Sequence, residues 1–126
     1  MDRILKSLTN ACFGLKYCFI TQRNMVIHAL IGGAVLLTGL LLSIPVFEML
    51  FVLTAITLLL VAEAFNTAIE YTIDLYSKER NRLAHIAKDV AAGAVLLSSV
   101  LAVIIVLVII GPPLWQLITT TLFASP

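Results

Sequence analysis

The sequence predicts an all-α membrane protein, in which an amphipathic surface helix precedes three transmembrane helices. Of the 126 residues, 61% are hydrophobic and only 12% are charged. Three stretches each supply the roughly 20 mainly apolar residues that are needed to cross a bilayer. The length fits a single domain over residues 1–126. We expect no nucleic-acid partner.

The first element, residues 1–24, is too polar to span a membrane. On a helix at about 100° per residue, its apolar side chains fall on one side, while Arg3, Lys6, Asn10 and Tyr17 gather on the other. A helix with this pattern lies in the membrane interface with its apolar face toward the lipid. Its polar face can also overhang a site on the cytoplasmic surface.

The three expected spans cover approximately residues 25–44, 47–76 and 90–110. The first ends before Pro45, and the third is stopped by the Gly-Pro-Pro sequence that begins at Gly111, because such sequences end helices. The tail beyond it is expected at the outer membrane interface. No small-residue cleavage site follows the first span, so we do not interpret it as a signal peptide.

Basic residues predict the orientation of the chain. All eight Lys and Arg residues lie before the first span or between the second and third spans, and positively charged loops stay in the cytoplasm. The N-terminus is therefore expected inside and the C-terminus outside, which agrees with three crossings. The two clusters are Arg3, Lys6, Lys16 and Arg23, and Lys78, Arg80, Arg82 and Lys88.

A polar face runs along the last three turns of the second span. Glu63, Asn66, Thr67, Glu70 and Asp74 fall within an arc of about 100°. Carboxylates inside a membrane are costly, face protein or water, and indicate function by default. Glu63 and Glu70 are two turns apart, about 10 Å along the axis, so one can lie near a metal and the other near a substrate hydroxyl.

Lys88 and Asp89 begin the third span, and an antiparallel neighbour places them near the depth of Glu70 and Asp74. Carboxylates for a divalent cation and a lysine for phosphate are what phosphoryl transfer requires. Two alternatives remain open at this point. Lys88 could neutralise Glu70 or Asp74 in a purely structural network, or Glu63 and Glu70 could bind protons or cations in a small coupled transporter.

Other chemistry is excluded or unsupported by the sequence. No Gly-rich phosphate-binding loop is present, which excludes a P-loop nucleotide enzyme. His28 and His85 have no Cys or His partner at metal-ligand spacing, and we interpret both as structural.

The segments "EAFNTAIEYTIDL" and, after a basic loop, "LAHIAKDVAAGAVLL" resemble the signature of the prokaryotic diacylglycerol kinase and undecaprenol kinase family. The resemblance runs from Arg3 to about Ile110 and includes both loop lengths. It implies a small kinase of the bacterial plasma membrane that works as a homotrimer, with composite active sites on the cytoplasmic side of subunit interfaces. Family members transfer the γ-phosphate of MgATP to the primary hydroxyl of a membrane lipid.

The resemblance also implies roles for the matching residues. Glu63 would be the general base that takes the hydroxyl proton, and Glu70 would hold the Mg²⁺ that bridges the nucleotide phosphates. Asn66 would position Glu63 or the phosphates, and Lys88 would contact phosphate oxygens. Asp89 would tie the loop and the helix together near this site.

The surface helix shows both agreement with the family and a departure from it. Arg3 and Lys6 match positions that would help to bind the nucleotide. Gln22 stands in "TQRNMVIH" where the family often has a glutamate that serves as a second metal ligand. An amide oxygen can ligate Mg²⁺ without adding charge, so we expect weaker metal binding or reliance on one main ion.

The residues of the two motifs resemble the Gram-positive and cyanobacterial branch of the family more than the enterobacterial branch, which prefers diacylglycerol. Undecaprenol is a common substrate in that branch, so we expect it to be favoured over diacylglycerol.

Overall fold

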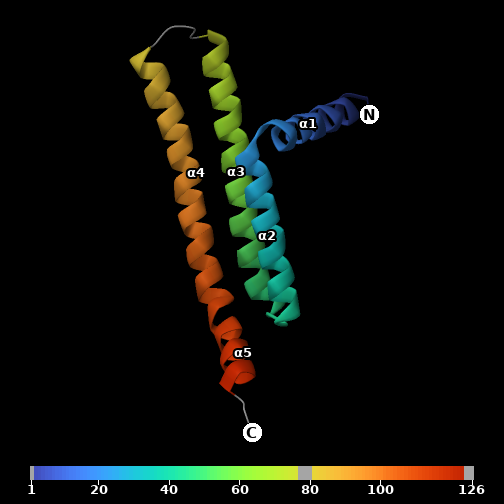
Figure 1. The fold of residues 1–126 in the computed structure, drawn as a ribbon. Helices are drawn as coiled ribbons and strands as arrows, with labels where there is room; N and C mark the ends of the chain where they lie inside the picture. The colour runs from blue at the N-terminus through green and yellow to red at the C-terminus, as the bar shows by residue number, and fades with distance from the viewer. Residues whose placement is uncertain (1, 77–80, 124–126) are drawn as a thin grey trace.

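Five α-helices make up the chain in its computed structural model, which describes residues 2–76 and 81–123 (Figure 1). Three of them are long and apolar enough to cross a membrane, which confirms the expected all-α class with three candidate spans. The five helices are α1 (Asp2–Thr21), α2 (Arg23–Leu41), α3 (Val46–Tyr76), α4 (Arg82–Ile109) and α5 (Gly111–Phe123).

Helix α1 projects from the bundle at a steep angle and has the N-terminus at its outer end (Figure 1). The chain turns from α1 into α2 at one residue, Gln22, whose backbone is extended (φ −106°, ψ 109°). Apolar side chains of α1 such as Leu8 and Phe13 are 59% and 70% exposed in the chain. These exposed side chains are what an interfacial helix presents to lipid.

A tight hairpin connects α2 to α3. Ser43 adopts a left-handed backbone conformation (φ 54°), and Pro45, which cannot continue α2, precedes the first residue of α3. The two helices approach closely because Gly32 of α2 faces Ile56 of α3. A Cβ atom at residue 32 would lie only 2.7 Å from the Cγ2 atom of Ile56. This contact fixes where α2 lies along α3.

Helix α4 begins at Arg82 rather than near Val90, where the apolar stretch led us to expect its start. The Asn81 side chain caps the helix by accepting a hydrogen bond from the Leu83 amide at 2.9 Å, so helix forms before the hydrophobic run begins. Lys88 therefore lies within the second turn of α4, well inside the helix. The basic residues between the second and third spans, which predict the orientation of the chain, include Lys78 and Arg80. These two lie outside the described residues.

Helices α2 and α4 both pack on α3, which is the centre of the bundle (Figure 1). Ala55 and Leu59 of α3 are buried against Ala102 of α4. The expected break at Gly-Pro-Pro ends α4 at Ile109, but a new helix, α5, begins at Gly111. Its prolines lie in the first turn, where backbone N–H groups have no helical partner to lose.

Candidate active site

The length of α3 sets the level of its polar face in the membrane. Its 31 residues extend about 46 Å, whereas the hydrocarbon core of a bilayer is about 30 Å thick. A helix that enters the core at Val46 leaves it after about 20 residues, near Asn66. Glu63, Asn66 and Glu70 therefore lie near the boundary between the hydrocarbon and the headgroups.

Glu63 is 2% exposed, and it lies between α2 and α4. The equally buried Thr67 donates its hydroxyl to the backbone oxygen of Glu63 at 2.9 Å, so this hydroxyl is satisfied within α3. Asn24 and His28, one turn apart on α2, are polar neighbours of the Glu63 carboxyl group. Glu63 makes no ion pair within the part of the chain that the structure describes.

Asn66 lies between the two acidic residues of the site along α3 and bonds to one of them. Its Nδ2 atom donates a hydrogen bond to Glu70 Oε1 at 3.0 Å. Its Oδ1 atom is buried and has no hydrogen-bond partner among residues 2–76 and 81–123. A buried polar atom without a partner is destabilising and calls for an explanation, such as a ligand or a cation.

These side chains open onto a cavity of about 320 Å³ between α2, α3 and α4. One wall carries the carboxylates and amides, and the α4 wall is largely apolar. We name this cavity the polar cavity. Its lining consists of Asn24, Glu63, Asn66, Glu70, Ala92, Val95, Leu96 and Ser99.

The polar cavity suits Mg²⁺ better than a softer metal, because its donors are oxygens. Glu70 and the unpartnered Asn66 Oδ1 atom supply adjacent oxygen ligands. No group of three or more His, Cys, Asp or Glu side chains is placed to hold a metal within the described ranges. Such a set fits Mg²⁺, which usually binds one or two carboxylates and takes its other ligands from water and substrate phosphates.

Lys88 lies one turn beyond the polar cavity. Its Nζ atom is 2.5 Å from Asp74 Oδ1, and the two side chains are 33% and 62% exposed. The structure thus brings Lys88 to the C-terminal end of the polar face of α3, as the antiparallel arrangement predicts. It pairs Lys88 with Asp74 and not with Glu70. Asp89, the next residue, is exposed on α4.

Gln22 is turned toward a different part of α3. Its Nε2 atom donates to the Tyr71 hydroxyl at 3.4 Å, and it does not line the polar cavity. The Tyr71 ring lies 5.7 Å from the ring of Tyr17 in α1, centroid to centroid. Hydrogen bonding to Tyr71 raises the pKa of the Tyr17 phenol. These contacts join α1 to α3, and metal binding by Gln22 stays a prediction.

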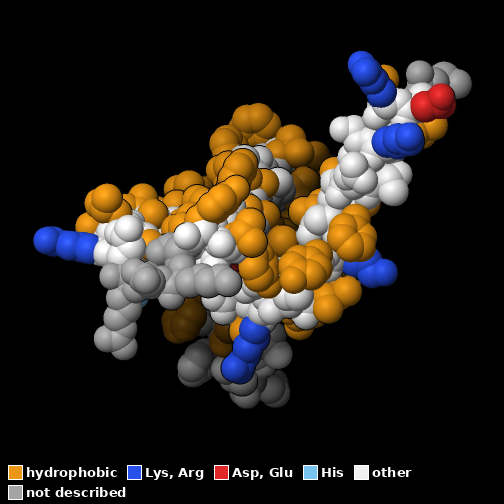
Figure 2. Space-filling view, turned by 90° about the horizontal axis from the view of Figure 1, so that it is seen from above, with side chains coloured by type: hydrophobic (Ala, Val, Ile, Leu, Met, Phe, Trp, Pro, Cys, Tyr) orange, Lys and Arg blue, Asp and Glu red, His pale blue; other side chains and the backbone are white. Residues whose placement is uncertain are grey.

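Arg3 and Lys6 lie in the first two turns of α1, at the end that points away from the bundle. Figure 2 shows basic side chains at this outer end of the projecting helix. Within one chain they are not brought near Glu63 or Glu70. Their role in nucleotide binding also stays a prediction.

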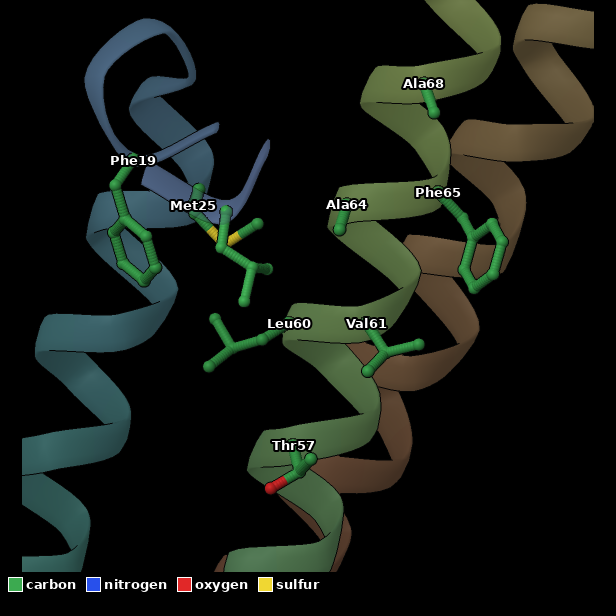
Figure 3. Close-up of a pocket in the computed structure, with 9 residues that line it drawn as sticks. Phe19, Met25, Thr57, Leu60, Val61, Ala64, Phe65 and Ala68 are labelled. Atoms are coloured by element: carbon green, nitrogen blue, oxygen red, sulfur yellow. The ribbon is translucent and has the colours of Figure 1, made fainter. Parts of the chain in front are cut away.

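A larger groove of about 490 Å³ lies beneath α1, where α1 and α2 face α3 (Figure 3). Phe19, Met25 and Leu60 point into the space between the helices, and Phe65 and Ala68 line its α3 side (Figure 3). It has no ionisable side chain and shares no lining residue with the polar cavity, so it offers no catalytic chemistry.

Sequence reasoning did not identify Asn24, and it treated His28 as structural. The spacing of these two residues contains a usable signal. They are separated by four positions, which places them on one face of α2, and that face is turned to Glu63. Placing the polar residues of the first span on a helical wheel would have paired this face with the polar face of the second span.

A family model described as Prokaryotic diacylglycerol kinase matches residues 9–110. The undecaprenol kinase of Bacillus subtilis is 38% identical over 114 residues, which cover 90% of this chain and 93% of that protein. The diacylglycerol kinase of Synechocystis is 39% identical over 115 residues, which cover 90% of this chain and 66% of that protein. The resemblance carried by the two motifs is confirmed.

Proposed function

Because the chain belongs to the prokaryotic diacylglycerol kinase family and is a membrane lipid kinase, we propose that it transfers the γ-phosphate of MgATP to undecaprenol in preference to diacylglycerol. The observation that carries this proposal is the buried Glu63 beside an unpartnered Asn66 Oδ1 atom, at the level where a lipid hydroxyl lies. A kinase uses such a site, and the transporter that the residues alone left open is not needed to explain it.

The choice of acceptor is supported by the share of each relative's length that aligns with this chain. The relative named undecaprenol kinase aligns over 93% of its own length, whereas the one named diacylglycerol kinase aligns over 66%. The residues of the two motifs, which resemble the Gram-positive and cyanobacterial branch of the family, support the same choice. An isoprenoid alcohol also has no polar group besides its hydroxyl, which suits a site whose polar atoms are confined to one end.

The proposed chemistry uses the residues of the polar cavity. Glu63 takes the proton of the lipid hydroxyl while that oxygen bonds to the γ-phosphorus, and the bond to the β–γ bridging oxygen breaks to release ADP. Asn66 and Glu70 would hold Mg²⁺, which when bound neutralises charge on the phosphate oxygens. Lys88 leaves Asp74 and contacts phosphate oxygens, and Asp89 ties the loop before α4 to the helix near this site. Positioning and charge neutralisation of this kind supply most of the catalysis of phosphoryl transfer.

We further propose a homotrimer with composite sites in the bacterial plasma membrane, with a cytoplasmic N-terminus. A 20-residue α1 is about 30 Å long, so Arg3 and Lys6 lie far from the Glu70 of their own chain. They could reach the polar cavity of a neighbouring copy. The outward-facing apolar residues of the spans are compatible with contacts to both lipid and other copies.

A direct test gives the purified protein radiolabelled ATP, Mg²⁺ and either undecaprenol or diacylglycerol in mixed micelles. We expect labelled undecaprenyl phosphate to form with the higher kcat/KM. A higher kcat/KM for diacylglycerol would overturn the proposed acceptor preference. Absence of lipid-linked phosphate with every alcohol would contradict the kinase proposal itself.

A further inference from the structure

Three buried residues mark the face of α2 that packs on α3, and they recur every seventh position: Met25, Gly32 and Gly39. A Cβ atom at the first or second glycine would meet the side chain of Ile56 or Met49, respectively. These two residues of α3 are also seven positions apart, so the antiparallel helices keep one register along this contact. Continued for seven more residues, the same register places Met25 level with Glu63.

Asn24 and His28 lie on one side of this contact. They stand one position before and three positions after Met25, so they point only about 40° apart on the helix. Asn24 lines the polar cavity together with Glu63, and His28 lines a neighbouring cavity that also includes Ser99 of α4. Because Ser99 lines the polar cavity as well, both residues of α2 are turned toward the space between α3 and α4. We name Asn24 and His28 the α2 pair.

The direction of the side chains brings the α2 pair to the carboxyl group of Glu63. Along the helix axis, Asn24 lies about 1.5 Å to one side of the level of Glu63, and His28 lies about 4.5 Å to the other. Each Cα–Cβ bond tilts toward the N-terminus of its own helix. In antiparallel helices, Glu63 therefore leans toward the level of His28, and His28 leans back toward Glu63. Both residues of the pair are neighbours of the Glu63 carboxyl group.

The polar neighbours of Glu63 on its own helix direct their hydrogen bonds elsewhere. The Thr67 hydroxyl donates to the backbone oxygen of Glu63, not to its carboxyl group. Asn66 Nδ2 donates to Glu70 Oε1 at 3.0 Å. A buried carboxylate is destabilising unless it receives hydrogen bonds. Within the part of the chain that the structure describes, the α2 pair is placed to supply them.

We propose that Asn24 and His28 are positioning residues, which donate N–H groups to the Glu63 carboxylate and leave one of its oxygen lone pairs facing the acceptor hydroxyl. This inference rests on the proposed function, in which Glu63 takes the proton of that hydroxyl, and deepens it. A base is effective only when it is within hydrogen-bond reach of the proton and correctly oriented. His28, which the sequence led us to interpret as structural, thereby gains a role in the reaction.

A double-mutant cycle tests whether His28 acts through Glu63. His28→Leu removes the donor and keeps a side chain of similar size. One hydrogen bond to a charged group is worth roughly 10- to 100-fold, so kcat with undecaprenol should fall by about tenfold or more. The KM for ATP should change by less than about twofold, because the nucleotide is not contacted. In the Glu63→Gln background, His28→Leu should change kcat by less than about twofold, since no carboxylate remains to be positioned.

Three further variants sharpen this experiment. His28→Gln retains an N–H donor and should keep kcat within about threefold of wild type. Asn24→Ala removes the other donor of the α2 pair and should lower kcat roughly tenfold, again without effect in the Glu63→Gln background. Val26→Leu is the matched control on α2, because Val26 is exposed and does not line the polar cavity. Its kcat should equal that of wild type.

The cycle separates failure of this inference from failure of the proposed function. If His28→Leu lowers kcat equally in the wild-type and Glu63→Gln backgrounds, His28 does not act through Glu63 and the positioning role is overturned. A His28→Leu variant with wild-type kcat overturns it as well. In both cases the kinase proposal stands. Near-normal turnover of Glu63→Gln alone would instead contradict Glu63 as the base.

A second measurement does not depend on turnover. The infrared difference spectrum between the wild type and Glu63→Gln isolates the carboxyl bands of Glu63. The same difference is then recorded in the His28→Leu background. We expect the bands to shift because a hydrogen-bond donor is lost, and to stay in place in the Val26→Leu background. Unshifted bands in His28→Leu would overturn the proposal. If circular dichroism shows loss of helix in His28→Leu, Asn24→Ala takes its place in both measurements, with the same expected and contrary results.

Discussion

Two acidic regions on one face of α3 differ in almost every physical respect. Near the C-terminal end of α3, Asp74 is neutralised by Lys88, and both side chains are substantially exposed. One to three turns deeper, Glu63 is buried, Asn66 has an unpartnered oxygen, and neither Glu63 nor Glu70 forms an ion pair within the described residues.

The difference distinguishes two interpretations that the sequence alone leaves open: a structural charge network and a functional site. A structural network explains the Lys88–Asp74 pair, although a pair this exposed contributes only about 0.2–1 kcal/mol to stability. It does not explain Glu63, because burying a carboxylate without a basic partner destabilises the fold. The outer region supports the packing of α3 on α4, and for the inner region we propose a role in chemistry.

The largest effect is expected from Glu63→Gln. The substitution keeps the shape of the side chain and removes its capacity to accept a proton, so turnover should fall by roughly 10²- to 10⁴-fold. Phosphate transfer to undecaprenol from radiolabelled ATP measures it. Because a buried charge is removed, the thermal stability of the purified variant should be equal to or above that of wild type. Turnover near the wild-type level would show that Glu63 is not the base.

Glu70→Gln tests the metal at the second acidic position. Glutamine can still accept the hydrogen bond from Asn66 Nδ2, so local structure should be kept while a charged ligand is lost. Loss of even an outer partner of a metal ligand costs about 10- to 100-fold in affinity, so we expect at least a tenfold rise in the Mg²⁺ concentration for half-maximal rate. The rate at saturating Mg²⁺ is the internal control. Superimposable Mg²⁺ curves would exclude Glu70 as a ligand.

Much of this comparison could be predicted from the sequence, because it depends on helical periodicity. The polar face of α3 and the depth of Lys88 follow from spacing within helices and from antiparallel neighbours. The pairing of Lys88 with Asp74 rather than Glu70 does not, because it depends on the crossing of two helices. The start of α4 was missed because the cap at Asn81 precedes the apolar stretch. Asn24 was missed because it becomes a neighbour of Glu63 only once α2 has packed against α3.

A smaller effect distinguishes phosphate binding by Lys88 from simple pairing. If Lys88 contacts phosphate oxygens, Lys88→Ala removes charge-assisted hydrogen bonds and should raise the KM for ATP roughly 10- to 100-fold. Asp74→Asn breaks the same ion pair from the other side and should change the KM by less than about threefold. Steady-state kinetics with varied ATP measures both. If the two substitutions changed the KM for ATP equally, Lys88 would have only a structural role, as the partner of Asp74.

The smallest effect concerns Gln22, which belongs to neither acidic region of α3 in the single chain. Glutamate at this position could accept a hydrogen bond from the Tyr71 hydroxyl, so Gln22→Glu should preserve the contact between the α1–α2 turn and α3. If residue 22 approaches the metal, the added charge should lower the Mg²⁺ concentration for half-maximal rate by about two- to fivefold. Tyr71→Phe is the matched control, because it removes the same contact without changing charge. An unchanged Mg²⁺ dependence in Gln22→Glu would assign Gln22 to joining the helices alone, and the metal would then depend on the inner acidic region.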